Sequence, residues 1–254
     1  MGAGHAHALY QHGHSTVHRM GPEAKLAAGF ASVVAIATTP REAVWAFALH
    51  AAVLAAVVTA AELPPRFVLR RLAIVLPFVA FAFTIPFVAG GEEVTVLGVG
   101  LSRDGLWGTW NVLAKAVLGA SVSIVVAGTT EEARIFKGLE RLRVPVAITL
   151  IATFMLRYLT LIADELRRTR VAMRARGYAP RWLWEARPVA SAAGAVFVRS
   201  YERGERVHAA MLARGFTGTM PELDTRTATR ADWLRGATVA GVVAATALAA
   251  AVTT

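Results

Sequence analysis

Two short stretches in the second half of the chain share one pattern, and each contains an arginine. Residues 173–178 read Met-Arg-Ala-Arg-Gly-Tyr and residues 211–216 read Met-Leu-Ala-Arg-Gly-Phe, with a constant offset of 38 residues. Glycine adopts positive φ without a steric cost, so Gly177 and Gly215 are expected to end two helices. A cation in the last turn is favoured by the helix dipole. The pattern therefore predicts two helix ends that present Arg176 and Arg214, whose guanidinium groups can bind carboxylates through two parallel hydrogen bonds.

A single Arg-Gly pair is also an ordinary way to finish a helix, and one copy alone indicates no more than that. The duplication extends upstream, because Arg168 and Arg206 share the same offset. A duplicated pattern on matched helices is harder to explain in that way. The two repeated Ala-Arg-Gly signatures are Ala175, Arg176, Gly177, Ala213, Arg214 and Gly215.

The polar N-terminal tail, residues 1–20, is the second candidate for chemistry. His5 and His7 form one His-x-His pair, and His12 and His14 form another. Imidazole nitrogens are common ligands of divalent transition metals. The spacing defines no metal geometry, however, and a solvated tail explains the same composition. The sequence leaves both interpretations open.

Lys115 is the third candidate, four residues after Asn111 in an apolar segment. An ionisable group at membrane depth often has a function. A lysine can equally extend its amine toward the membrane surface, or pack against the bundle. The sequence does not define the role of Lys115.

The composition indicates an integral membrane protein. Of the 254 residues, 56% are hydrophobic and only 17% are charged, a low share for a soluble domain. Of the 27 Lys and Arg residues, 14 lie at positions 164–235, which the positive-inside tendency places on the cytoplasmic side. Cysteine is absent, which excludes disulfides and thiolate metal sites.

The motifs of several other protein classes are missing. The chain has no Gly-x-x-x-x-Gly-Lys phosphate loop and no His-Glu-x-x-His motif, so we expect neither ATP hydrolysis nor another recognisable enzyme activity. A nucleic-acid surface would place aromatic residues among the basic ones. Trp182 and Trp184 instead share a single turn, which argues against that class.

Five apolar segments predict an all-α, polytopic membrane helix bundle of about five spans, with the N-terminus inside. The first segment is short against the ~20 residues that cross a bilayer. Pro77 and Pro86 are expected to kink the third. Between the third and fourth, the acidic, Gly-rich residues 90–105 are expected outside, with a small hairpin around Gly98. The segments are 26–39, 43–61, 72–89, 106–127 and 236–252.

A further apolar segment, 146–163, has arginines on both flanks, which disfavours a crossing of the membrane. Apolar residues three or four positions apart form a stripe from Ile148 to Met173, as on one face of an amphipathic helix. Asp164 precedes Arg168 by four residues, a favourable helical ion pair. We therefore predict a helix at 146–176 beneath the bundle rather than across the bilayer.

A second long helix is predicted at 188–214. Small residues, Ser200 and Gly204 among them, lie in the middle of its stripe and would allow two helices to approach closely. We predict an X-shaped pair that meets near Gly204. The expected domains are a His-rich tail (1–20), a transmembrane bundle (21–128), a cytoplasmic coupling module (129–234) and a final transmembrane helix (235–254).

With its two Ala-Arg-Gly signatures, the chain resembles the transmembrane T component of energy-coupling factor (ECF) transporters, the vitamin- and metal-importing relatives of ATP-binding-cassette machines. It looks most similar to the cobalt-transport, CbiQ-like group. The resemblance covers about residues 14–220 and includes Gly-His-Ser-Thr-Val-His-Arg at 13–19 and Arg-Ser-Tyr-Glu-Arg-Gly-Glu-Arg-Val at 199–207. Arg174 adds a charge before the first signature, and its role is undefined.

The resemblance implies two coupling helices whose Arg176 and Arg214 dock in two ATPase subunits that hold ATP and Mg. It also implies a small, separate membrane subunit that binds the substrate, so no metal ligand carries over to this chain. The expected function is a scaffold and coupling subunit of a bacterial inner-membrane importer for divalent metal. Cobalt, as used in cobalamin biosynthesis, is the expected substrate. Nickel or vitamin import, and a stand-alone carrier using the histidine tail and Lys115, stay open as alternatives.

Overall fold

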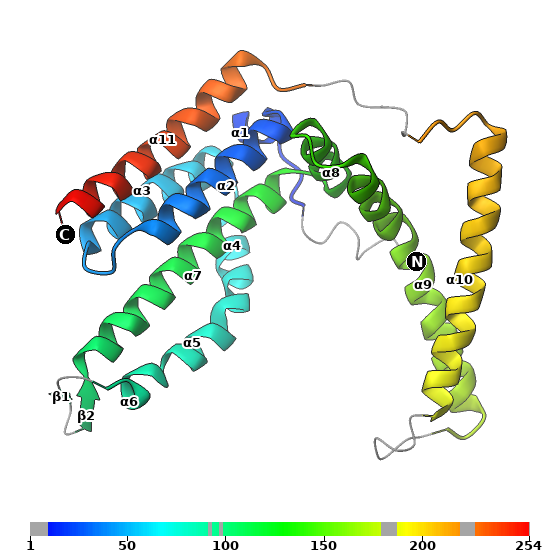
Figure 1. The fold of residues 1–254 in the computed structure, drawn as a ribbon, viewed down its shortest axis with the longest axis horizontal. Coiled ribbons are helices and arrows are strands. Elements are labelled where there is room, and N and C mark those ends of the chain that lie inside the picture. Colours follow the sequence, from blue (N-terminus) through cyan, green and yellow to red (C-terminus); the bar gives the residue numbers. More distant parts are fainter. Residues whose placement is uncertain (1–9, 91–92, 97–98, 179–186, 219–226, 254) are drawn as a thin grey trace. The chain divides into compact units, whose positions relative to one another are not determined.

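The computed structural model describes residues 10–90, 93–96, 99–178, 187–218 and 227–253. The chain divides into two compact units (Figure 1). The first, here called the membrane unit, comprises Met1–Leu142 and Arg226–Thr254. The second comprises Arg143–Thr225 and is called the coupling unit after the role expected for it from the sequence. The chain therefore leaves the membrane unit once and returns to it once.

The membrane unit is a helix bundle. Its longer helices are α2 (Pro22–Thr38), α3 (Val44–Ala60), α7 (Arg103–Thr129) and α11 (Arg230–Thr253), preceded by the short α1 (Thr16–Arg19). α2 contacts both α7 and α11, and α3 contacts the same two helices. Buried apolar side chains from all four helices form the core. They are Ala35, Ile36, Phe47, Leu118, Val243 and Ala247.

The segment between α3 and α7 is broken where the prolines predict it. It consists of α4 (Pro65–Leu72), the 3₁₀ turn η1 (Ala73–Val75), α5 (Leu76–Ala82) and α6 (Ile85–Val88). Pro77 and Pro86 each lie in the first turn of a new helix, where the missing N–H costs nothing. The predicted kinks are therefore confirmed. The predicted hairpin is also present, with β1 (Glu93–Val96) antiparallel to β2 (Val99–Ser102); Gly98 lies outside the described residues.

Among the described residues, four helical segments are long and apolar enough to cross a membrane: Pro65–Val88, Arg103–Thr129, Val146–Ala175 and Arg230–Thr253. α2 and α3 are apolar but have 17 residues each. These helices confirm a polytopic helical membrane protein. Val146–Ala175 meets the same length condition, although its arginine-rich flanks disfavour a crossing.

The packed part of the membrane unit begins before residue 20, within the residues expected to form the polar tail. His18 and Ser15 are both buried. The Ser15 hydroxyl accepts from the His18 backbone N–H, and His18 Nε2 donates to the Gln11 carbonyl at 3.0 Å. A Cβ on Gly13 would lie 2.7 Å from the imidazole. Residues 13–19 thus pack closely around the His18 side chain.

One carboxylate holds both ends of the connection to the coupling unit. Glu23 Oε1 accepts from the Ala228 N–H at 2.6 Å, just after the chain returns. Glu23 Oε2 lies 3.5 Å from Arg141 Nη1, at the end of α8 (Glu132–Arg141) and just before the chain leaves. α8 packs on α2 and so belongs to the membrane unit, although it lies within the predicted 129–234 module. We call Glu23, Arg141 and Ala228 the base clasp.

We expect Glu23→Gln to lower the free energy of unfolding by about 1–3 kcal/mol, because a buried charged partner is lost from the base clasp. Thermal unfolding in detergent measures this. The matched control is Glu42→Gln, whose side chain is 53% exposed and pairs with Arg41 on the surface. That pair should change stability by less than about 1 kcal/mol. Equal effects of the two changes would contradict a special role for Glu23.

The burial of His18 predicts that the stability of the protein depends on pH. Burial lowers the pKa of the His18 imidazole below its ordinary value of 6.5. As the pH falls below that value, the unfolded chain takes up a proton that the folded chain resists, so the free energy of unfolding must fall. His18→Gln has no such proton. We expect it to remove part of the loss of stability that the wild type shows between about pH 8 and about pH 5.5. Parallel pH profiles for the two proteins would contradict this role.

Candidate functional site

The coupling unit is built on two long helices, α9 (Val146–Ala175) and α10 (Arg187–Ala213). Their bounds lie within one residue of the predicted 146–176 and 188–214. Glu165 on α9 bonds Arg199 Nε at 2.5 Å and Arg203 Nη2 at 3.4 Å on α10. These ion pairs join the helices where they cross (Figure 1). The Asp164–Arg168 pair predicted from spacing is absent among the described residues, and the adjacent Glu165 bridges the helices instead.

The ion-paired Arg199 and Arg203 flank Ser200 and lie next to Gly204, the two residues predicted for the crossing. Ser200 is at the crossing, with its hydroxyl buried and without a hydrogen-bond partner among the described residues. A Cβ on Gly204 would meet no atom within 4 Å. Close contact at Gly204 therefore does not hold the described helices together; the Glu165 ion pairs do.

Beyond the crossing, α9 and α10 enclose a cavity of about 480 Å³. It is lined mainly by apolar side chains, with Phe154, Met155 and Tyr158 on one side and Val207 and Met211 on the other. Much of the apolar stripe of α9 is uncovered within the coupling unit, and Ile148, Ile151, Met155 and Leu159 are each about 60% exposed. A stripe of this kind requires lipid or another protein surface.

Both helices end in the same backbone motif. At the end of α9, the Tyr178 N–H donates to the Met173 carbonyl at 3.1 Å and the Gly177 N–H donates to the Arg174 carbonyl at 3.0 Å. Gly177 has a φ of +80°. This pair of bonds is the Schellman cap, in which glycine takes the left-handed conformation.

The end of α10 has the same two cap bonds as the end of α9. The Phe216 N–H donates to the Met211 carbonyl at 3.0 Å, the Gly215 N–H donates to the Leu212 carbonyl at 3.0 Å, and Gly215 has a φ of +80°. The cap explains the glycine through its positive φ. It also explains the methionine and the aromatic residue, since a hydrophobic contact between these two positions often accompanies the motif.

The cap leaves Arg176 and Arg214 without a structural role. Both are exposed, as are Ala175 and Ala213 beside them. Neither guanidinium forms a hydrogen bond or an ion pair with any described residue. An arginine that serves neither the cap nor the packing, repeated at two matched helix ends, is available for a partner's carboxylates.

The other predicted candidates differ from this pair. His12 and His14 are exposed, His5 and His7 lie outside the described residues, and no cluster of three potential metal ligands occurs in the described part of the chain. Lys115 Nζ donates at 2.8 Å to the Ala37 carbonyl near the end of α2, where carbonyls lack helical partners. Lys115 therefore has a structural role in joining α7 to α2. Sequence spacing could not reveal it, because the partner is a backbone atom 78 residues away.

The caps generate a prediction about the two glycines. Gly177→Ala and Gly215→Ala should each destabilise the preceding turn by about 1–2 kcal/mol, because the left-handed conformation is unfavourable for a residue with a Cβ. Amide hydrogen exchange in the last turn of α9 or α10 should become about 5- to 30-fold faster. Gly194→Ala in α10 is the control, since it has open space and ordinary helical geometry; it should slow exchange. Unchanged exchange in both cap variants would contradict the assignment.

Comparison with known proteins gives the family. Residues 13–225 match the family model of CbiQ, the cobalt transport protein. The cobalt transport protein CbiQ of Rhodobacter capsulatus is 29% identical over 178 residues, which cover 70% of this chain and 71% of that protein. An uncharacterised protein of Methanocaldococcus jannaschii is 24% identical over 169 residues, covering 61% of this chain and 56% of that protein. With its matched caps and apolar bundle, this chain belongs to the CbiQ cobalt transport protein family.

Proposed function

We propose that this chain is the transmembrane coupling subunit, or T component, of an ECF-type importer for a divalent metal ion, with cobalt as the substrate. The observation that carries the proposal is the matched pair of exposed arginines, Arg176 and Arg214, at two identically capped helix ends. Membership of a cobalt transport family supports the substrate. The membrane helices support a location in the bacterial cytoplasmic membrane.

The two helix ends that carry Arg176 and Arg214, here called the tips, indicate which partners the chain would bind. Each arginine tip would enter an acidic groove of one of two ATP-binding-cassette ATPase subunits, which would bind and hydrolyse ATP with Mg. The apolar stripe of α9 and the cavity beside α10 offer a surface for a small substrate-binding membrane subunit. The metal ion would be bound by that subunit, so the cobalt is cargo and this chain supplies no ligand to it.

The geometry suggests how motion would be transmitted. ATP-driven closure of the ATPase pair would shift the two tips relative to each other. Because α9 and α10 are continuous helices of 30 and 27 residues, a displacement at a tip reaches the crossing at Glu165. The ion pairs to Arg199 and Arg203 would act there as a pivot, and the apolar faces beyond it would move with the substrate subunit.

The alternative is a stand-alone carrier that uses the histidine tail and Lys115. The bond from Lys115 to the Ala37 carbonyl, which joins α7 to α2, does not favour a transport role for this lysine. The exposed His12 and His14 remain available to a metal, but they would belong to an accessory tail. A carrier would also leave the two arginine tips without a function. The two proposals differ in whether the chain requires an ATPase.

The test is capture of ATPase subunits. In a membrane extract that contains the full set of subunits, Arg176→Glu and Arg214→Glu should each weaken capture by this chain by at least about thirtyfold, because a charge reversal leaves buried acidic partners unpaired at an interface. The double variant should capture none. Arg170→Glu, an exposed arginine earlier on α9, is the matched control and should retain capture.

Membrane insertion and thermal stability should be unchanged in all of these variants, because no described residue pairs with either tip arginine. Cobalt uptake should fall with capture. Continued ATP-independent uptake by the double variant would contradict the proposal and favour the carrier. Capture by the double variant would show that the tips are not the docking sites.

A further inference from the structure

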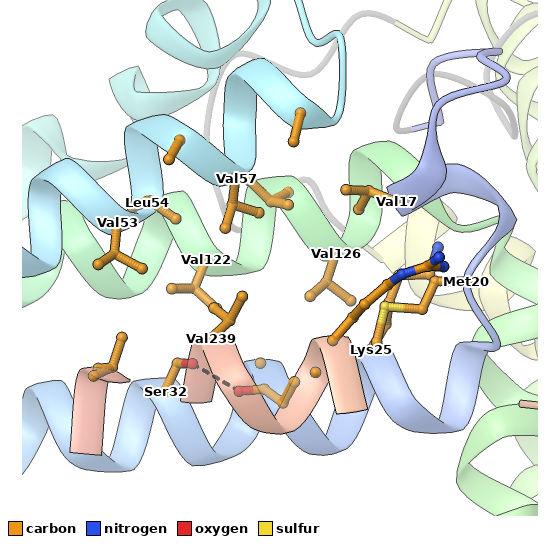
Figure 2. Close-up of a pocket in the computed structure, with 18 of the residues that line it drawn as sticks. Val17, Met20, Lys25, Ser32, Val53, Leu54, Val57, Val122, Val126 and Val239 are labelled. Atoms are coloured by element: carbon orange, nitrogen blue, oxygen red, sulfur yellow. Dashed lines mark hydrogen bonds between the residues drawn. The ribbon is translucent and has the colours of Figure 1, made fainter. Parts of the chain in front are cut away.

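The membrane unit contains a second cavity, which the proposed coupling function does not use. It has a volume of about 430 Å³ and lies between α2, α3, α7 and α11 (Figure 2). Its walls are mainly apolar, with Val53, Leu54, Val57, Val122, Val126 and Val239 among the aliphatic residues. The polar lining residues are Thr16, Lys25, Ser32, His50, Thr129, Arg235 and Thr238. We call this cavity the slot.

The slot is long enough to span one membrane leaflet. Its lining extends along α2 from Lys25 to Ile36, eleven positions, and along α3 from Ala60 to His50, ten positions. At 1.5 Å per residue, the two distances are about 16.5 Å and about 15 Å. The hydrocarbon core of a bilayer is about 30 Å thick, so the slot matches about half of it.

The walls of the slot favour hydrocarbon over water. An apolar cavity with few polar partners stays dry, and even a much smaller one of about 150 Å³ binds benzene. Among the polar residues on the wall, Ser32 donates its hydroxyl proton to the Ala28 carbonyl at 2.8 Å (Figure 2). His50 Nε2 donates to the Val243 carbonyl at 3.2 Å, while His50 Nδ1 is buried without a hydrogen-bond partner among the described residues. An acyl chain therefore suits the slot better than a chain of water molecules does.

One end of the slot is cationic. Figure 2 shows Lys25 at that end, beside Met20 and close to Val17. Lys25 is 6% exposed, and its amine donates to the carbonyl of Thr129 at 2.9 Å and to its hydroxyl at 3.5 Å. Among the described residues, no carboxylate forms an ion pair with this amine. A buried ammonium held only by neutral oxygens is unfavourable without an anion.

The nearby acids are engaged elsewhere. Asp232 accepts from the backbone N–H groups of Gly21 and Thr229, at 3.4 and 3.0 Å, and lies 3.5 Å from Arg235. Glu23 belongs to the base clasp. Arg235 also lines the slot, with a side chain that is 59% exposed. The cationic end therefore offers one buried amine and one accessible guanidinium to an incoming anion.

We propose that the slot binds one acyl chain of an anionic phospholipid from the cytoplasmic leaflet, with its phosphate at Lys25 and Arg235. Basic pockets between membrane helices on that side attract anionic head groups. The Lys25 end adjoins the connections to the arginine-rich coupling unit, which the positive-inside tendency places in the cytoplasm. The bound lipid would act as a structural element that fills the centre of the four-helix bundle.

The first measurement is native mass spectrometry of the full-length chain, purified in mild detergent with any subunits that accompany it. We expect one phospholipid per chain to be retained. Phosphatidylglycerol should raise the unfolding temperature more than phosphatidylcholine of the same chain length, with at least about tenfold tighter binding, because only the former has a net negative charge.

Variants of the slot separate this site from the surrounding lipid. Val57→Phe and Val122→Phe fill the slot and should abolish retention, whereas Val34→Phe, on a side chain that is 45% exposed and outside the lining, should not. Lys25→Met and Arg235→Gln should each reduce the preference for phosphatidylglycerol. Arg235 is exposed enough that its variant should fold even where a core variant does not.

Three results would overturn the proposal. The first is equal binding of the two lipids by the wild type. The second is retention of a phospholipid by the slot-filling variants. The third is an assembled complex in which cross-links from the slot reach another subunit while no phospholipid remains bound. None of these results depends on transport, so the lipid site can fail while the coupling function stands.

Discussion

The left-handed turn at Gly177 and Gly215 is the constraint on which the candidate site depends. With a φ of +80°, each glycine stops a long helix at a defined residue and directs the chain away from its axis. Arg176 and Arg214 occupy the last position before that turn and are left exposed. Because the two caps share the same bonds, the two tips have the same local geometry, as two equivalent docking partners would require.

Two sets of contacts hold the helices that carry those tips. Glu165 joins α9 to α10 through Arg199 and Arg203, so the tips belong to one unit. The base clasp at Glu23 fixes the points where that unit leaves and re-enters the membrane bundle. Each link uses one carboxylate to hold two positions: Glu165 pairs with two arginines, whereas Glu23 pairs with Arg141 and accepts from the Ala228 N–H. Such pairs keep their partners in register, since loss of one leaves a charge uncompensated.

Much of the local structure could be predicted from the sequence. Pro77 and Pro86 fix where the third segment breaks, because proline cannot continue a helix. The spacing of apolar residues predicted α9 and α10 to within a residue, and the repeated Met-x-Ala-Arg-Gly pattern predicted both ends. The crossing was harder to place. Small residues pointed to Ser200 and Gly204, whereas the ion pairs that join the helices use the adjacent Arg199 and Arg203. Sequence spacing also favoured Asp164 over its neighbour Glu165.

By itself the sequence determined what depends on neighbours along the chain: helix periodicity, proline breaks, glycine caps, and the membrane class that composition imposes. Only the tertiary structure decided which distant groups meet. It paired Glu23 with Arg141 and Ala228, gave Lys115 a carbonyl on α2, buried His18, and left Lys25 without a carboxylate at the end of an apolar slot. The physical reason is that these contacts are fixed by how helices pack, and packing depends on many side chains at once.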